Sequence, residues 1–318
     1  MNAKQPGPGG IVVVDKPAGL TSHDVVARVR RLAGTRKVGH AGTLDPMATG
    51  VLIVGIERTT RLLGHLAGGE KCYEATIRFG ESTDTDDATG TSTGRHDPTG
   101  LSAEAVRAAA VQFTGTIMQV PAQISAIKVA GERAYKRVRA GEDVELTARE
   151  VTVSQLDLGE LRPADGMLDV DAVITCSSGT YIRALARDLG AALGCGAHLT
   201  RLRRTRVGPF GIAQARTLQE HQDELAVVPL DRVAEVSFPV RRLDATAASI
   251  IAHGGWIPAA EPAPEGAVAA FDPTGRFIAL LGDSRGRSWP TTVFVGPDDL
   301  QQLRPSADPT SGTDLAES

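Results

Sequence analysis

The alternation of hydrophobic and polar positions along the chain predicts a series of short strands. Residues 11–14 and 51–54 are continuous apolar runs, which are typical of buried strands. Residues 73–79 and 168–174 alternate with a period of two, which indicates half-buried strands. The pattern therefore predicts several strands in the core of the protein.

Helical spacing occurs in three segments between these strands. Thr21 and Asp24 have the spacing of a capping box, and apolar residues recur every three or four positions after them, so residues 22–33 are predicted to be a helix. Residues 103–113 and 180–193 show the same period. Strands and helices are interleaved irregularly rather than as strict strand–helix–strand units, which favours an α+β fold.

Two segments lack both periods. Residues 81–100 are rich in Asp, Thr and Gly and are predicted to be a long loop. Residues 119–150 mix Pro, Gly and basic residues, and an irregular stretch of that length in a compact domain is often functional. We expect residues 119–150 to be a mobile lid within a first domain that spans residues 1–238.

The C-terminal quarter of the chain has a different pattern. A predicted helix at 245–256 precedes two predicted strands at 267–272 and 276–281, which flank an Asp-Pro-Thr-Gly turn. We interpret residues 239–297 as a small β-rich second domain. Residues 298–318 are rich in Pro, Ser and acidic residues and are expected to be a disordered acidic tail.

The composition is that of a globular protein with a sizeable core. The chain has 318 residues, of which 42% are hydrophobic and 23% charged. No apolar run reaches the roughly 18 to 20 residues that span a bilayer, and residues 1–10 lack the features of a signal peptide. We therefore expect a cytoplasmic protein with no membrane partner. Cys72, Cys176 and Cys195 form no CxxC pair, which predicts free thiols rather than disulfides or a zinc site.

The net charge of −4 hides an uneven distribution. Residues 241–318 hold six basic and ten acidic residues, so the remainder of the chain is neutral. Three basic clusters lie in that remainder, at residues 28–37, 128–139 and 201–206. Clusters of this kind either bind phosphates or form solvated surfaces, and the charge pattern alone allows both.

The strongest candidate for chemistry is the segment Gly39–Gly50, which holds three glycines and a proline in twelve residues. This composition predicts a tight loop, anchored by the apolar run that follows it. The loop presents His40 and Asp45. A carboxylate held in this way can act as a nucleophile or as an acid or base, but Asp before Pro is also a common turn residue.

Other motifs fail on spacing. The sequence contains no GxxxxGK[ST] phosphate loop and no HExxH zinc motif. The segment Asp84–Gly90 resembles a calcium loop only in part, because Ala88 occupies the fifth position and no glutamate closes it. We therefore expect no metal ion and no cofactor.

Residues 39–52 resemble the signature GHxGxLDPxAxGxL of the TruB-type tRNA pseudouridine-55 synthases. Further segments similar to the motifs of this family follow in the same order over about residues 10–220. They are Asp15–Ser22 (KPxGxTS), Lys71–Tyr73, Thr83–Gly90 (TDTxDxxG), Ser178–Arg183 (SGTYIR) and Gly194–Leu199 (GCGAHL). The segment Gln119–Lys128 departs from the pattern. The family usually has two prolines and an aromatic residue before Ser-Ala, and Val120 and Ile124 stand in those places here.

The resemblance implies a pseudouridine-synthase fold, in which helices flank a mixed, largely antiparallel sheet and a small PUA-like domain binds RNA. It implies that a uridine in the T-loop of tRNA is flipped out, cut at its glycosidic bond and rejoined through carbon 5, without a cofactor. Asp45 would be the nucleophile, toward either the uracil ring or the ribose. Arg183 would pair with Asp45, and Tyr73 would stack on the uracil and act as general base.

The resemblance also makes residues 1–238 a catalytic domain with the lid at 119–150 as its RNA-binding insertion, and it implies further residues that contact the RNA. His40 would fill the gap left by the flipped base, and Lys16 would lie beneath the loop of Asp45. The remaining candidates for the pocket and its RNA rim are Tyr181, Arg61, Leu202, Lys128, Arg133, Lys136 and Arg137.

The expected partner is the T-stem-loop of tRNA, bound by a monomer without a guide RNA or an obligate protein partner. Two other classes of RNA-binding protein are alternatives. A non-catalytic RNA-binding protein on the same scaffold would not need to keep Asp45, Tyr73 and Arg183 together. A guide-RNA-dependent relative would usually carry longer basic extensions.

Overall fold

The computed structural model describes residues 9–122, 128–129, 132–133 and 147–295. The chain divides into two compact units, Met1–Val227 and Val228–Ser318. This division precedes helix α7 (Leu230–Ser237), whereas the sequence places the domain boundary after it. The domain boundary at residue 238 remains a prediction.

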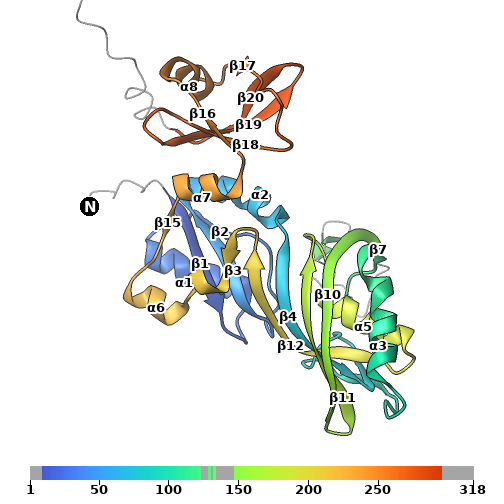
Figure 1. The fold of residues 1–318 in the computed structure, drawn as a ribbon. Coiled ribbons are helices and arrows are strands. Elements are labelled where there is room, and N and C mark those ends of the chain that lie inside the picture. The colour runs from blue at the N-terminus through green and yellow to red at the C-terminus, as the bar shows by residue number, and fades with distance from the viewer. Residues whose placement is uncertain (1–8, 123–127, 130–131, 134–146, 296–318) are drawn as a thin grey trace, which may run out of the picture. The chain divides into compact units, whose positions relative to one another are not determined.

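The first unit is built around one sheet (Figure 1). In spatial order its strands are β14 (Arg216–Thr217), β1 (Gly10–Lys16), β3 (Thr49–Ile56), β12 (Ala197–Val207), β4 (Lys71–Phe79), β11 (Met167–Cys176), β10 (Arg149–Ala164) and β7 (Gly115–Gln119). Neighbours are antiparallel except for the parallel pairs β1–β14 and β3–β12. The mixed, largely antiparallel sheet that was predicted is confirmed, as are its strands at 11–14, 51–54, 73–79 and 168–174.

Helices pack on this sheet through two hydrophobic clusters. Valines of α1 (Ser22–Ala33) and a leucine of α6 (Leu218–Asp223) cover β1 and β3. Apolar residues of α3 (Ala103–Ala110) and α5 (Ile182–Ala192) cover β4, β11 and β12. Helix α1 begins with the predicted capping box, so the three predicted helices of this unit are confirmed.

Strand β12 lies in the middle of the sheet although it carries four arginines. Three of these arginines form ion pairs with carboxylates. The pairs are Arg201–Glu74, Arg203–Asp15 and Arg206–Glu70. The fourth, Arg204, is buried and contributes to the candidate site described below.

The predicted loop at residues 81–100 is wrong in part, because it contains the antiparallel hairpin of β5 (Glu81–Thr83) and β6 (Ser92–Arg95). Most of β6 is exposed, so its sequence carries no apolar alternation. The other elements of the first unit are β2 (Val38–His40), η1 (Glu57–Leu62), α2 (Leu63–Gly68), η2 (Val111–Phe113), β8 (Lys128–Val129), β9 (Glu132–Arg133), β13 (Phe210–Gly211) and η3 (Ile212–Gln214).

The second unit contains a five-stranded sheet, as expected for a small β-rich domain. Its strands in spatial order are β16 (Val240–Arg242), β18 (Val268–Phe271), β19 (Phe277–Ser284), β20 (Arg287–Val293) and β17 (Ile257–Pro258). The unit also holds β15 (Val228–Pro229), α7 and α8 (Ala245–Ala252). The predicted pair of strands around the Asp-Pro-Thr-Gly turn is confirmed as β18 and β19. In the part of the chain that the structure describes, every helix is too short or too polar to cross a membrane.

Candidate active site

Asp45 lies in the loop between β2 and β3, and the segment after β1 fixes this loop in place. The N–H of Leu44 donates to Oγ of Ser22 at 2.9 Å, and that hydroxyl lies 3.1 Å from the carbonyl of Leu44. The N–H of Gly19 donates to the carbonyl of Pro46 at 2.8 Å. Both neighbours of Asp45 are thus tied to the same turn, so its carboxylate has a defined position.

Lys16 is fully buried beneath this loop, where the resemblance places it. Its Nζ donates to the carbonyls of Pro17, Leu20 and Pro46 at 2.9, 2.7 and 3.3 Å. Burial lowers the pKa of Lys16 to about 8, and the nearby charge of Asp45 opposes this shift. Lys16 therefore tethers the end of β1 to the loop of Asp45.

Arg183 joins Asp45 to a second carboxylate. Its Nε lies 2.9 Å from Oδ2 of Asp45, and its Nη1 lies 3.4 Å from Oδ2 of Asp87. Nη1 also donates to the carbonyl of Thr85 at 2.7 Å. The side chain of Arg183 is 5% exposed, whereas that of Asp45 is 34% exposed. The guanidinium is thus held from behind and orients a carboxylate that a ligand can reach.

The turn that carries Asp87 is fixed by its own side chains. The hydroxyls of Thr85 and Thr89 both donate to Oδ1 of Asp87, at 2.8 and 2.6 Å. Next to it, Oδ2 of Asp86 lies 3.3 Å from Nη1 of Arg187. Burial raises the pKa of Asp86 to about 6 although Arg187 opposes the shift. The segment that resembles TDTxDxxG therefore supports Arg183.

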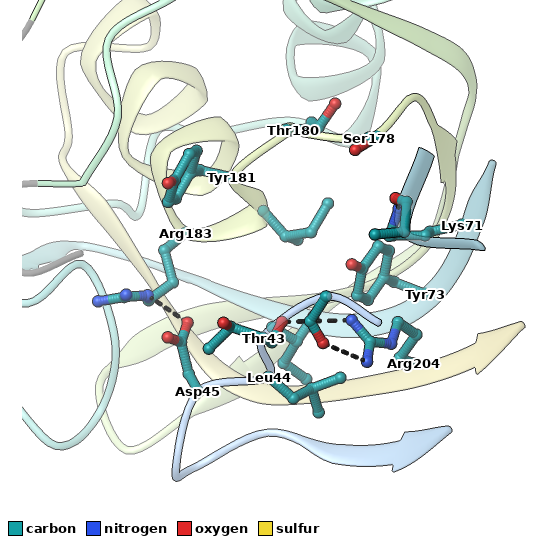
Figure 2. Close-up of a pocket in the computed structure, with 15 residues that line it drawn as sticks. Thr43, Leu44, Asp45, Lys71, Tyr73, Ser178, Thr180, Tyr181, Arg183 and Arg204 are labelled. Atoms are coloured by element: carbon teal, nitrogen blue, oxygen red, sulfur yellow. Dashed lines mark hydrogen bonds and ion pairs between the residues drawn. The ribbon is translucent and has the colours of Figure 1, made fainter. Parts of the chain in front are cut away.

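A cavity of about 290 Å³ opens beside Asp45 (Figure 2). Five predicted site residues line it together: Asp45, Tyr73, Tyr181, Arg183 and Leu202. The other lining residues are Gly42, Thr43, Leu44, Ala67, Lys71, Ser178, Gly179, Thr180, Ile182 and Arg204. Segments that are far apart in the sequence thus converge on one pocket.

Tyr73 comes from β4 and is almost entirely buried. Burial raises the pKa of its phenol, while the charge of Arg204 and a hydrogen bond from Arg204 oppose that shift. The phenol is therefore neutral at rest, with a guanidinium beside it that would stabilise a phenolate.

Tyr181 is held through its backbone. Its N–H donates to Oε1 of Gln119 at 2.8 Å, and its carbonyl accepts from Nε2 of Gln119 at 3.1 Å. Gln119 is buried at the end of β7. This clamp sets the start of α5, and with it the positions of Tyr181 and Arg183.

The wall formed by β4 and β12 contains two buried cations that sequence reasoning did not single out. Nε of Arg204 donates to the carbonyl of Val51 at 2.7 Å, and its Nη atoms donate to the carbonyls of Thr43 and Gly42 at 3.3 and 3.2 Å. Nζ of Lys71 donates to the carbonyls of Ala67 and Gly69, both at 2.8 Å. Figure 2 shows both cations beside Tyr73, on the side of the pocket away from Arg183.

Comparison with known proteins identifies the family. The model described as "TruB family pseudouridylate synthase (N terminal domain)" matches residues 30–182. Two C-terminal models, of tRNA pseudouridylate synthase B and tRNA pseudouridine synthase II, match residues 183–236 and 238–295. A relative from Thermobifida fusca (strain YX), named tRNA pseudouridine synthase B, is 57% identical over 90% of this chain and 99% of its own length. The chain belongs to the TruB family of pseudouridylate synthases.

Other relatives support the same assignment to the TruB family. A tRNA pseudouridine synthase B from Arthrobacter sp. (strain FB24) is 55% identical over 90% of this chain and 96% of its own length. Among solved structures, a chain of a Cbf5-Nop10-Gar1 complex matches with a TM-score of 0.70 and 25% identity, covering 92% of this chain and 86% of that one. A chain of an archaeal box H/ACA sRNP Nop10-Cbf5 complex matches with a TM-score of 0.67 and 26% identity, covering 92% and 88%. The predicted pseudouridine-synthase fold is thereby confirmed.

Three predicted residues of this TruB-family chain that the structure describes do not line the cavity: Lys16, which lies beneath the loop of Asp45, His40 and Arg61. His40 ends β2, and its ring meets the ring of His23 edge to face, with centroids 5.5 Å apart. Arg61 lies exposed in η1. Lys128 and Arg133 belong to β8 and β9, but their side chains, like the whole of Lys136 and Arg137, lie outside the described residues. The roles predicted for these residues, and the lid at 119–150, stay predictions.

The structure shows no candidate metal centre in the residues it describes, since no three His, Cys, Asp or Glu side chains come together there. The three cysteines are free, as predicted. Burial raises the pKa of Cys176 to about 11, so this thiol is protonated at neutral pH.

Proposed function

We propose that the protein converts a uridine in the T-loop of tRNA, at position 55, to pseudouridine. The observation that carries this proposal is the ion pair of Asp45 and Arg183 at a cavity that Tyr73 also lines. The relatives named tRNA pseudouridine synthase B support the choice of tRNA as substrate.

The size of the cavity fits a single flipped base. A volume of about 290 Å³ is at the lower limit of small-molecule sites, so the pocket suits one pyrimidine rather than a larger ligand. A uridine in a loop has no pairing partner to lose, so flipping it costs only a few kcal/mol. In our proposal Tyr73 stacks on the flipped base, and His40 takes the place that the base leaves in the RNA.

Asp45 is the nucleophile of the proposed reaction. Its partial exposure lets it approach a base in the cavity, and Arg183 keeps its carboxylate oriented. Both attack on the ring and attack on the ribose carbon are compatible with this position. In either route the uracil turns inside the pocket, where its effective concentration stays high, before carbon 5 bonds to the ribose.

Tyr73 is proposed to take part in removing the proton from carbon 5. Its neutral phenol can accept the proton of carbon 5 while it passes its own proton toward N1, the atom that gains one, or it can act as a phenolate that Arg204 stabilises. The product is an isomer of the substrate, so the reaction needs no external reactant. The protein is proposed to work as a monomer, without a guide RNA.

The test is incubation of purified protein with unmodified tRNA, followed by mapping of pseudouridine with single-nucleotide resolution. We expect modification at the T-loop uridine without added guide RNA. A tRNA with cytidine at that position and the Asp45→Asn variant serve as matched controls. Absence of pseudouridine with folded wild-type protein, or formation only with a guide RNA, would overturn the proposal.

A further inference from the structure

The wall of the cavity formed by β4 and β12 carries two buried cations, Arg204 and Lys71, that pair with no carboxylate among the described residues. Arg204 is 1% exposed and Lys71 is 6% exposed. Among the residues that the structure describes, neither side chain forms an ion pair with Asp or Glu; their recorded protein partners are carbonyl oxygens and the hydroxyl of Tyr73. Burying cations with no anionic partner costs free energy, so this arrangement needs a physical reason.

Each of the two cations retains capacity to bind a ligand. A guanidinium has five N–H donors, and Arg204 uses three of them on carbonyls. An ammonium has three, and Lys71 uses two. Both side chains line the cavity, so a remaining donor of each can serve a group inside it. Three basic side chains and one acidic side chain line the pocket, which favours an anion there.

The proposed isomerisation, on which this inference rests, creates such an anion. When the N1–C1′ bond breaks, its electron pair stays on the uracil, and N1, O2 and O4 share the negative charge. If Asp45 first adds to the ring, the ring carries the charge as an enolate. In the ribose route the carboxylate leaves C1′ with its electron pair as the C5–C1′ bond forms. In the ring route it leaves carbon 6 with its electron pair after that bond has formed and carbon 5 has lost its proton. In both routes carbon 5 gives up one proton and N1 gains one. In both routes, negative charge moves from Asp45 to the base.

We propose that Arg204 and Lys71 stabilise the negative charge that develops on the detached uracil. We call this pair the cationic wall. The two cations act before the reaction as fixed charges, because carbonyl tethers on Gly42, Thr43, Ala67 and Gly69 hold them in place. A charge that is already oriented requires no reorganisation when the anion forms. Asp45 instead has Arg183 as its ion-pair partner.

Figure 2 shows Arg204 and Lys71 on the side of the pocket opposite Arg183. Tyr73 is proposed to stack on the uracil, and Arg204 and Lys71 are drawn beside Tyr73. Burial and the charge of Arg204 lower the pKa of Lys71 to about 8, with Cys176 as an opposing neighbour. That shift reflects an environment in which an added anion would be favourable.

The test compares Lys71→Met with Lys71→Arg in single-turnover reactions at saturating enzyme. Loss of one preorganised donor to a developing anion typically costs about 10²- to 10³-fold in rate, and we expect this loss for Lys71→Met. Lys71→Arg should recover most of it, because the charge is retained. Arg78→Met, which removes a cation from the same strand outside the cavity, is the matched control and should match wild type. The single-turnover rate of Arg204→Lys is a second measurement, in a variant that keeps the charge but changes the hydrogen bonds to the loop carbonyls.

A second substrate separates stabilisation of the anion from a merely structural role. Fluorine at carbon 5 makes the base a more stable anion, so a tRNA with 5-fluorouridine at the target should depend less on the cationic wall. The expected result is a smaller rate loss for Lys71→Met on 5-fluorouridine, measured as its disappearance from nuclease digests, than on uridine. Equal losses on both substrates, or a Lys71→Met rate within threefold of wild type, would overturn the cationic wall alone. Wild-type protein that forms no pseudouridine would overturn the proposed function, and the cationic wall with it.

Discussion

Two buried arginines face the same cavity, and their partners differ. Arg183 contacts the carboxylates of Asp45 and Asp87, so its charge is neutralised within the protein. Arg204 donates to three backbone carbonyls, and Lys71 beside it to two more. One wall of the pocket, which we call the balanced wall, therefore pairs the cation Arg183 with carboxylates. The cationic wall instead holds cations that donate to carbonyl oxygens and form no ion pair among the described residues.

This difference indicates two ways in which a folded chain uses a buried cation. An arginine between two carboxylates is oriented by one of them and orients the other. Arg183 therefore positions the carboxylate of Asp45 as a nucleophile. A cation tethered by neutral carbonyls keeps its field, since carbonyl dipoles compensate it only in part. The first arrangement orients a charge that is already present, and the second suits one that appears during the reaction.

Removing the nucleophile of the balanced wall should cause the largest loss of turnover. Asp45→Asn keeps the shape of the side chain but cannot act as a carboxylate nucleophile, so turnover should fall by at least about 10⁴-fold. Binding of tRNA should stay within a few fold of wild type, because binding is spread over many phosphates. Pseudouridine formation and filter binding measure the two quantities. Substantial product from the variant would remove Asp45 from the nucleophile role.

Tyr73 comes from the same strand as Lys71, and its substitution should show the next largest effect. Tyr73→Phe keeps the ring for stacking but removes the hydroxyl and its hydrogen bond with Arg204. Single-turnover rates should fall by about 10²- to 10⁴-fold, the range typical of a lost acid or base, with little change in binding. If the Phe variant and wild type agree within twofold, another group removes the proton.

Arg183→Lys keeps the positive charge of the balanced wall but replaces the planar guanidinium, which contacts two carboxylates, with an ammonium. An ammonium cannot reach Asp45 and Asp87 with the same geometry, and a misplacement of about 1 Å can cost about 10²-fold in rate. We therefore expect a loss of this size on uridine and an equal loss on 5-fluorouridine. That equality contrasts with the unequal losses expected for Lys71→Met. A smaller loss on 5-fluorouridine would assign Arg183 to the uracil anion instead.

The balanced wall was largely predictable from the sequence, whereas the cationic wall was not. Helix α1 follows from its capping box, and Asp45, Tyr73 and Arg183 lie in motifs with recognisable spacing. Arg204 was visible only as one member of a basic cluster, and such clusters are usually solvated. The available signal was the spacing of Leu202 and Arg204 on one strand, since residues two apart share a face. A strand with four arginines carries no hydrophobic alternation, so its central position in the sheet could not be inferred.

Support for Arg183 was hidden for a related reason. Asp87 lies in a segment that looks like a loop, and its role depends on Thr85 and Thr89, which fix its carboxylate. Gln119 acts through the backbone of Tyr181, so its function requires a contact between residues 62 positions apart. Local patterns report periodicity and caps, but they do not report which distant backbone group a buried polar side chain will meet.

The smallest expected effect concerns stability, and it tests whether the cationic wall is costly to fold. Burial lowers the pKa of Lys71 from 10.5 to about 8, with Arg204 adding to the shift. A shift of this size corresponds to up to about 3 kcal/mol of unfavourable free energy for the charged form in the folded state. Below pH 8 Lys71 is charged in both the folded and unfolded protein, so the full cost is present. Between about pH 8 and 10.5 the unfolded state binds more protons, and the contribution of Lys71 to the free energy of unfolding rises with pH.

Lys71→Met should therefore raise the Tm of the protein at pH 7, by about 2 to 4 °C for each kcal/mol gained after its lost hydrogen bonds are subtracted. This advantage should shrink as pH rises from 8 to 10, because wild-type Lys71 then sheds its proton and its cost. Lys71→Arg is the matched control: it stays charged throughout, so its Tm should fall further below wild type over the same range. Thermal melts of the three proteins at pH 7, 8, 9 and 10 give the comparison. A Met variant that is less stable than wild type at every pH would show that the carbonyl tethers outweigh the buried charge, and that Lys71 stabilises the fold.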